Sequence, residues 1–248
     1  MCLLALQYKT ARDAPVLVAQ NREERYDRPS QPPRIQSGRP RVVCGIDRKA
    51  GGTWFGVNQH GMFVAVANRP KRCVPAEPRS RGLLCRELLG TRTATDAAEL
   101  AVKELETGRY DGASYICADA DAAIVVYGGD IVDAVTLKPG LHLITNGNVN
   151  DRSDPRQEFV RRLLTLQRLD SSVAFLAVAS RTFSRKPDAR GKRGVVIVGN
   201  ERGTVSSSLL SLADRSQNSV YQYAAGSPGD NPYDDISALL RQVLSTDR

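Results

Sequence analysis

The 248-residue sequence predicts an α+β fold in which two antiparallel sheets carry helices on their outer faces. The first observation is the order of the periodic segments, which runs strands, helices, strands, helices, strands. The second is the presence of tight-turn residues between neighbouring strand segments. Hydrophobic residues make up 41% of the chain, which is enough for a substantial core, and no repeat or low-complexity block interrupts the order. We therefore expect a single domain over residues 1–248.

The first half of the chain contains short apolar runs with polar turns between them. They predict strands at residues 3–8 and 15–20, and a hairpin at 53–57 and 62–67. Gly61 lies in the hairpin turn, where a glycine supplies a positive φ without a steric penalty. The stretch 28–41 is rich in proline and arginine and is predicted to be an exposed loop.

Two helices are predicted next, at 81–89 and 94–106, with Asp96 near the start of the second and Gly108 at its end. The pattern then returns to strands. These are expected at 113–118, 122–127, 131–137 and 141–145, joined as an antiparallel meander by turns rich in Asp and Gly.

The last third of the chain alternates again. Helices are predicted at 155–168 and 170–184, and Pro155 is a favourable residue for a first helical turn. Closing strands are expected at 194–199, 203–210 and 218–225, followed by an amphipathic helix at 233–244. The basic stretch 185–193 is expected to be an open loop.

The net charge of the chain does not by itself indicate a binding partner. The chain has 35 basic and 27 acidic residues, for a formal charge of +8. The basic residues are dispersed in short groups without interleaved aromatic residues, so we expect no nucleic-acid binding.

The cysteines indicate the redox setting. They stand at positions 2, 44, 73, 85 and 117 without CxxC or metal-finger spacing, which predicts reduced thiols and a cytoplasmic location. The first apolar stretch ends at Gln7 and lacks a basic flank, so no secretory signal is expected. No membrane-spanning helix is expected, because the sequence has no run of about 20 apolar residues. No cofactor or metal is expected, since His60 and His142 lack a second ligand at a useful spacing.

The candidate nucleophile is Cys2, which directly follows Met1. Removal of Met1 would leave a thiol and a free α-amino group on one residue. An α-amino group titrates near ~7.7 to 8.0, close enough to working pH to take a proton from the thiol and later return it to a leaving amine. That combination suits amide hydrolysis. The other interpretation is that Cys2 is a small buried residue of the first strand.

Four further motifs lie at the ends of predicted strands. They are Asn21-Arg22-Glu23-Glu24, Gly51-Gly52-Thr53-Trp54-Phe55-Gly56, Asn68-Arg69-Pro70 and Thr145-Asn146-Gly147. A guanidinium such as that of Arg22 favours a nearby thiolate, and a carboxylate from Glu23 or Glu24 can hold the amino group. A polar turn with an ion pair is the other interpretation of the first motif. Asparagine is also a common turn residue at strand ends.

Together with Met1-Cys2, these motifs resemble the NRDE family, also called the transport and Golgi organisation family, from Met1 to about Phe159. The resemblance implies an Ntn-hydrolase-like fold, a four-layer αββα sandwich related to choloylglycine hydrolase and penicillin V acylase. It also implies that Arg22 lies near the nucleophile, with an acidic residue close by. Glu23 departs from the family pattern, which usually has Asp at that position.

The resemblance further implies that Asn68 and Asn146 match asparagines of the oxyanion hole and polar wall in the related acylases. An amide side chain donates hydrogen bonds at any working pH, so it can stabilise a tetrahedral oxyanion. The expected catalytic set is Cys2, Arg22, Glu23, Glu24, Asn68 and Asn146, with Asn21, Trp54 and Arg69 as candidates for substrate binding. For Trp54, the single tryptophan, packing in the core is the other interpretation.

Two functions follow from these residues. The first is an amidase or acylase that cleaves a non-peptide carbon–nitrogen bond, with a small molecule such as an acyl amide as substrate. The second is a non-catalytic protein that binds or moves haem or a lipid on the same scaffold, because a fold does not by itself fix a function.

Overall fold

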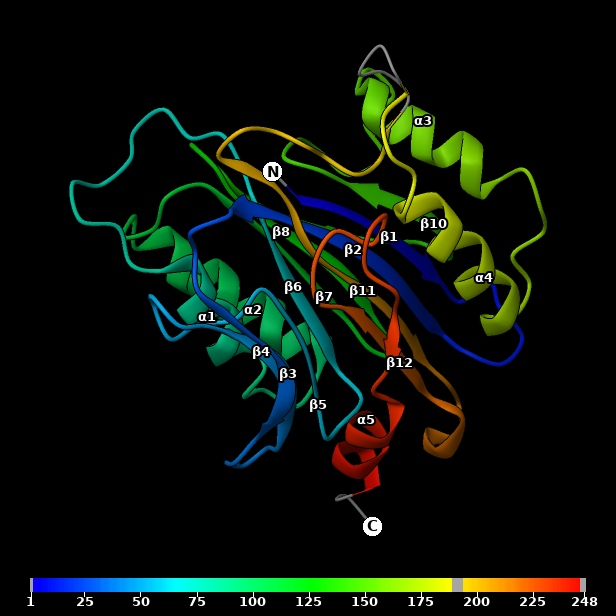
Figure 1. Ribbon diagram of the computed structural model, residues 1–248. Coiled ribbons are helices and arrows are strands. Elements are labelled where there is room, and N and C mark those ends of the chain that lie inside the picture. The colour runs from blue at the N-terminus through cyan, green and yellow to red at the C-terminus, as the bar shows by residue number, and fades with distance from the viewer. Residues whose placement is uncertain (1, 189–193, 246–248) are drawn as a thin grey trace. The chain divides into compact units, whose positions relative to one another are not determined.

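The computed structural model describes residues 2–188 and 194–245, which form two compact units (Figure 1). Unit 1 comprises residues 1–27 and 139–238, and unit 2 comprises residues 28–138 and 239–248. Each unit is built on one antiparallel sheet. The predicted pair of antiparallel sheets with helices is therefore confirmed.

Unit 1 contains a six-stranded sheet. Its strands, in hydrogen-bonded order, are β10 (Gly140–Ile144), β1 (Cys2–Tyr8), β2 (Val16–Arg25), β11 (Arg202–Leu212), β12 (Val220–Ala224) and β13 (Asp234–Asp235). A short 3₁₀ helix, Ser216–Asn218, precedes β12. Strand β1 thus lies in the sheet interior, with β10 on one side and β2 on the other.

Helices α3 (Pro155–Leu164) and α4 (Ser172–Phe183) pack on one face of this sheet (Figure 1). Alternate strand residues such as Leu3 and Leu17 join Phe175 and Phe183 of α4 in one buried core. This is the period-2 alternation of a strand that buries one face against helices. Each helix begins at a side-chain cap, Asp154 for α3 and Ser171 for α4.

Unit 2 contains a seven-stranded sheet. Its strands, in order, are β3 (Ser30–Gln36), β4 (Val42–Asp47), β5 (Phe55–Asn58), β6 (Phe63–Asn68), β7 (Ala113–Ala118), β8 (Ala123–Gly128) and β9 (Val132–Thr136). Helices α1 (Arg81–Leu88) and α2 (Ala94–Glu106) pack on this sheet, and α5 (Ser237–Leu244) ends the described chain. No helix among the described residues is long and apolar enough to cross a membrane.

Several predicted elements are confirmed closely. Helix α2 has the predicted bounds, and Thr93 and Asp96 form a capping box at its start. Gly108 after it has a φ of 72°, and Gly61 in the β5–β6 turn has a φ of 76°. Gly61 therefore supplies the positive φ expected of it, and Gly108 ends the helix as predicted.

Other predictions were wrong. The proposed loop 28–41 contains strand β3, and β4 was not foreseen. Prolines are tolerated in β3 because it is an edge strand that pairs on one side only. Residues 194–199 form no strand, and α5 begins only at Ser237, after the short strand β13.

Two placements also differ from prediction in ways that bear on the site. The segment Asn21 to Glu24 lies inside β2, which continues to Arg25, rather than after the strand. Strand β10 leaves the predicted meander and pairs with β1, in the other sheet. The meander itself therefore ends at β9.

The Gly51–Gly56 motif brings its backbone close to that of helix α1. The amide N–H of Thr53 donates to the carbonyl of Gly82 at 2.9 Å, and a Cβ on Gly52 would overlap the Gly82 backbone. We expect Gly52→Ala to destabilise the protein by roughly 1–3 kcal/mol, because the contact is with backbone that cannot rotate away. Urea unfolding against Gly147→Ala, which has room for a Cβ, checks this; equal midpoints for the two variants would contradict it.

Candidate functional site

The strand register places the backbone of Cys2 between two predicted site residues. Cys2 is the first residue of β1 and pairs with Arg22 of β2. On the other side, β1 pairs with β10, and the last paired residues are Leu4 and Ile144. Two positions further along each segment are Cys2 and Asn146, which follows the end of β10. The sheet of unit 1 therefore brings Cys2, Arg22 and Asn146 to one end.

Arg22 is held in a buried, polar part of this sheet. Its residue is 5% exposed, and its guanidinium lies 4.0 Å from the Glu24 carboxylate. Its neighbour in β11 is Ser206, just after an irregularity in the β2–β11 register. Burial raises the pKa of Tyr223, while a hydrogen bond with Ser206 and the charge of Arg22 oppose this.

Sequence reasoning missed Ser206 and Tyr223. Both lie in the last third of the chain, where no motif pointed to them. The alternation of apolar and polar residues along the predicted strands could have marked Ser206 as a polar position of a strand. It could not have shown that Ser206 pairs with Arg22, because the two residues are far apart in the sequence. Only the register of β11 with β2 shows that Ser206 lies beside Arg22.

The two adjacent glutamates have different environments. The Glu23 side chain is 4% exposed and forms a bidentate ion pair with Arg156 of α3, in which one oxygen lies 2.9 Å from Nη1 and the other accepts from Nη2. Arg156 Nη2 also donates to the carbonyl of Val195 at 3.0 Å. Burial raises the pKa of Glu23, and the guanidinium of Arg156 opposes that rise.

Glu24 is instead the carboxylate near Arg22. It is about one-third exposed and lies 4.0 Å from the guanidinium of Arg22 and 4.0 Å from that of Arg202. Successive residues of a strand point to opposite faces, which explains why Glu23 reaches α3 and Glu24 reaches Arg22. The sequence left open which carboxylate meets Arg22, and the structure identifies Glu24.

Asn21 and Asn146 both carry an amide oxygen that is buried and has no hydrogen-bond partner among the residues described. Asn21 is fully buried and donates from Nδ2 to the carbonyl of Phe183 at 3.0 Å, which ties β2 to the end of α4. Its predicted role in substrate binding stays a prediction. In Asn146 the unsatisfied atom is the acceptor oxygen Oδ1, so its predicted role as an amide donor stays a prediction.

The loop that carries Asn146 is held by the first turn of α3. Thr145 Oγ1 donates to Asp154 at 2.6 Å, and the buried Gln157 donates to Thr145 Oγ1 at 3.1 Å and to the carbonyl of Asn148 at 2.9 Å. These bonds come from a helix rather than from a mobile segment. They fix the backbone on both sides of Asn146.

The remaining predicted residues belong to unit 2. Trp54 is 7% exposed and packs on Gly45, where a Cβ would lie 2.6 Å from its ring, so the core interpretation fits it. Arg69 stacks its guanidinium on the ring of Tyr127, 4.3 Å from the centroid. Asn68 is the last residue of β6 and pairs with Ala113. Their predicted roles in the chemistry stay predictions.

His142 Nδ1 lies 2.9 Å from Nδ2 of Asn150, within the β10 region. In the described ranges, no group of three or more His, Cys, Asp and Glu side chains is placed to hold a metal ion.

Comparison with known families bears out the motif resemblance. The model of the family described as Transport and Golgi organisation 2 matches residues 1–180. The chain belongs to this family. The match extends beyond Phe159, where the recognisable motifs end, and so includes α3 and most of α4.

Two family members with curated descriptions are similar to about half of the chain. The Transport and Golgi organization protein 2 homolog of Homo sapiens and the corresponding homolog of Mus musculus are each 29% identical over 139 residues. The alignments cover 53% of this chain and 50% of each relative. The chain thus spans about half the length of the curated relatives it matches.

Similarity to solved structures of other proteins identifies the fold of this chain. The Caenorhabditis elegans N-acylethanolamine-hydrolyzing acid amidase ortholog has a TM-score of 0.56 at 13% identity, with 98% of each chain covered. Penicillin V acylase from Agrobacterium tumefaciens has a TM-score of 0.52 at 12% identity, with 90% of this chain and 83% of that chain covered. The chain therefore has an Ntn-hydrolase-like fold.

The Glu23–Arg156 pair makes a testable contribution to stability. We expect Arg156→Met to cost about 3–5 kcal/mol at neutral pH, because it leaves a buried carboxylate without its partner. In this variant burial keeps the folded pKa of Glu23 above its unfolded value, so folding favours the protonated form. The decrease in the free energy of unfolding is therefore largest at a pH above the raised pKa of Glu23. It becomes smaller as the pH falls toward about 4.3, the usual pKa of glutamate.

Urea unfolding across this pH range measures the effect. Arg152→Met is the matched control, since Arg152 is 70% exposed and its pair with Glu158 should contribute no more than about 1 kcal/mol. The double variant with Glu23→Gln should lose most of the pH dependence. A pH-independent loss in Arg156→Met alone would contradict the assignment.

Proposed function

We propose that the protein is an N-terminal-nucleophile hydrolase that cleaves a non-peptide carbon–nitrogen bond, with Cys2 as nucleophile. The observation that carries this proposal is the register that sets the Cys2 backbone between Arg22 and the segment leading to Asn146. Fold similarity supports it, because the similar structures include an acylase and an amidase. Another is a C2A variant of conjugated bile acid hydrolase from Clostridium perfringens, so cysteine also stands at position 2 of that enzyme.

The proposed reaction has two stages. In the first, the α-amino group of Cys2 takes the thiol proton, and the thiolate adds to the carbonyl carbon of the substrate. The carbon–nitrogen bond then breaks, and the amine leaves with the proton returned by the α-ammonium group, which leaves a thioester. In the second stage, water gives a proton to the α-amino group and attacks the thioester, which releases the carboxylic acid and restores the thiol.

The neighbouring residues have separate parts in this proposal. The buried guanidinium of Arg22 stabilises the thiolate, and Glu24 orients it from 4.0 Å. Glu23 is held by Arg156 on the helix side of β2, so Glu24, on the same side as Arg22, is the carboxylate that can hold the α-amino group. Asn146 provides an amide donor for the oxyanion, a contribution that is typically worth ~100- to 1,000-fold in rate.

Selective labelling of the thiols tests the proposal. Burial raises the pKa of Cys44 to about 11 and that of Cys117 to about 12, and it raises the pKa of Cys85 as well, so these three thiols should not compete. Cys73 is exposed, and Cys73→Ser removes it. We expect iodoacetamide at pH 6.5 to modify Cys2 in this variant much faster than an unactivated thiol, whose pKa is about 8.5.

Mass spectrometry of the intact protein and of its amino-terminal peptide measures both the removal of Met1 and the site of labelling. It should show removal of Met1 and one modification per chain at Cys2. Met1 retained in every molecule would contradict the mechanism, since the base would then be an amide nitrogen. Labelling of Cys2 no faster than that of Cys73 in the unmutated protein would contradict an activated thiolate.

The charge of Arg22 should set the pH dependence of that labelling. Arg22→Met is expected to move the midpoint of the rate profile upward by about 1–3 pH units, because the thiolate loses a nearby positive charge. Arg22→Lys keeps the charge and should retain a midpoint close to that of the unmutated protein. Coincident profiles for the Met variant and the unmutated protein would remove Arg22 from the mechanism.

A further inference from the structure

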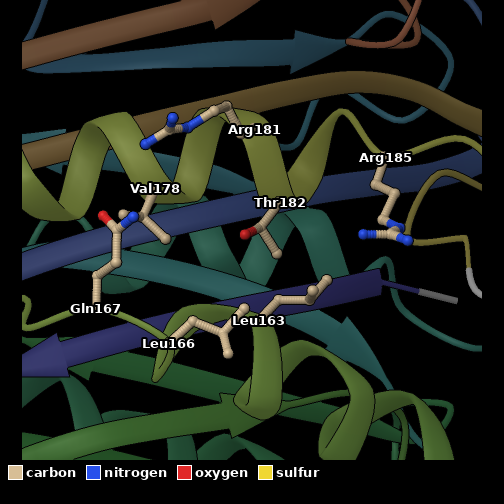
Figure 2. A pocket seen from close by; sticks show the side chains of 7 residues that line it. All are labelled: Leu163, Leu166, Gln167, Val178, Arg181, Thr182 and Arg185. Atoms are coloured by element: carbon tan, nitrogen blue, oxygen red, sulfur yellow. The ribbon is translucent and has the colours of Figure 1, made fainter.

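Three cavities lined by described residues of unit 1 can be compared with the position of Cys2. The first, of about 180 Å³, lies between α3 and α4 and is lined by these helices and the turns after them, including Val178, Arg181 and Arg185 (Figure 2). The second, of about 310 Å³, includes Gln7 and Thr10, at the far end of β1 from Cys2. Neither is lined by the strand residues around Cys2.

The third cavity lies at the same end of the sheet as Cys2. It has a volume of about 400 Å³, and its lining includes Tyr26, Ile197, Val198, Thr204, Val205 and Asp230. Thr204 and Val205 belong to β11, where the register with β2 is irregular just before Ser206. Ser206 pairs with Arg22, and Arg22 pairs with Cys2.

The distance from the nucleophile follows from this register. Cys2, Arg22 and Ser206 lie side by side on three neighbouring strands, so the Cys2 and Ser206 backbones are about 10 Å apart at a strand spacing of about 4.8 Å. Val205 is the next residue to Ser206. By backbone spacing, the cavity therefore begins about two strands away from Cys2.

The lining indicates which kind of group fits. Ile197, Val198 and Val205 are aliphatic, and Tyr26 and Val198 are 52% and 68% exposed, so apolar surface of the lining is accessible to a ligand. Asp230 is the charged member, and it is already paired with Lys186. Thr204 is also engaged, since its Oγ1 accepts from the amide of Ile197 at 2.9 Å.

We propose that this cavity, which we call the β11 groove, binds an uncharged, flexible alkyl segment of the substrate whose amide is cleaved at Cys2. The inference rests on the proposed function, since it assigns the groove to the substrate of that reaction. It adds that substrate preference is set by residues of β11 and the 197–198 segment, which lie in the last third of the chain and outside the matched family segment. The described lining has no cationic side chain to bind an anionic group, and its one charged member is the carboxylate of Asp230.

N-alkyl chloroacetamides test the groove directly. The Cys2 thiolate displaces chloride from the probe, so a carbon–sulfur bond forms, the carbon–chlorine bond breaks, and chloride leaves with the bonding electrons. The Cys73→Ser protein is treated with probes that carry methyl, butyl, hexyl and octyl chains below the concentrations at which they aggregate. We expect the second-order labelling rate to rise with chain length by up to about fourfold per methylene, until the chain fills the groove.

Two matched variants locate the effect. Val198→Glu places a charge in the groove at an exposed position, so it should fold normally and flatten the dependence on chain length. Val173→Glu is the control, because Val173 is 73% exposed on α4 and does not line the groove. It should keep the steep dependence of the unmutated protein.

The outcomes separate the two proposals. Equal rates for all chain lengths, with the methyl probe still selective for Cys2, would overturn the groove assignment and leave the hydrolase proposal standing. A chain-length dependence that survives Val198→Glu would also overturn the assignment. Failure of even the methyl probe to select Cys2 would overturn both.

Discussion

The pairing of β1 with strands on both sides is the constraint on which the candidate site depends. Chain ends usually fray because few contacts order them. Here the first strand lies in the interior of a six-stranded sheet, and its register with β2 begins at Cys2 itself. Backbone pairing with β2 therefore holds Cys2 in place, which a residue needs if it is to act as both nucleophile and base.

Because side chains alternate between the two faces of β2, the charged residues Arg22, Glu23 and Glu24 have different partners. Arg22 and Glu24 form one loose pair, while Glu23 crosses to α3 and is clamped by Arg156. A single strand thus supplies one charged group to the site and another to the contact between sheet and helices. The same helix α3 also holds the loop after β10 through Gln157, so one element supports both sides of the Cys2 position.

Local signals in the sequence predicted the parts of the fold that local physics controls. The bounds of α2 and the positive φ at Gly61 depend on residues within a few positions of each other, and both were foreseen. The partners Glu23 and Arg156 are 133 positions apart, and no local pattern shows that they meet. For the same reason the pairing of β10 with β1 was missed, since a strand run does not reveal which sheet it joins. The order of the motifs could identify the candidate site, but only the register shows which carboxylate lies beside Arg22.

Strand β3 illustrates a different use of proline. An unpaired sheet edge is a template on which another chain can add a strand, and long exposed edges promote aggregation. Pro32 and Pro33 lie in this edge strand and have no amide hydrogen to offer, and the pairing of β3 with β4 is itself irregular between Gln31 and Arg34. A strand from another molecule would therefore find no amide donors at the middle of this edge. The prolines that led to the prediction of a loop thus also disfavour association through the edge of the sheet.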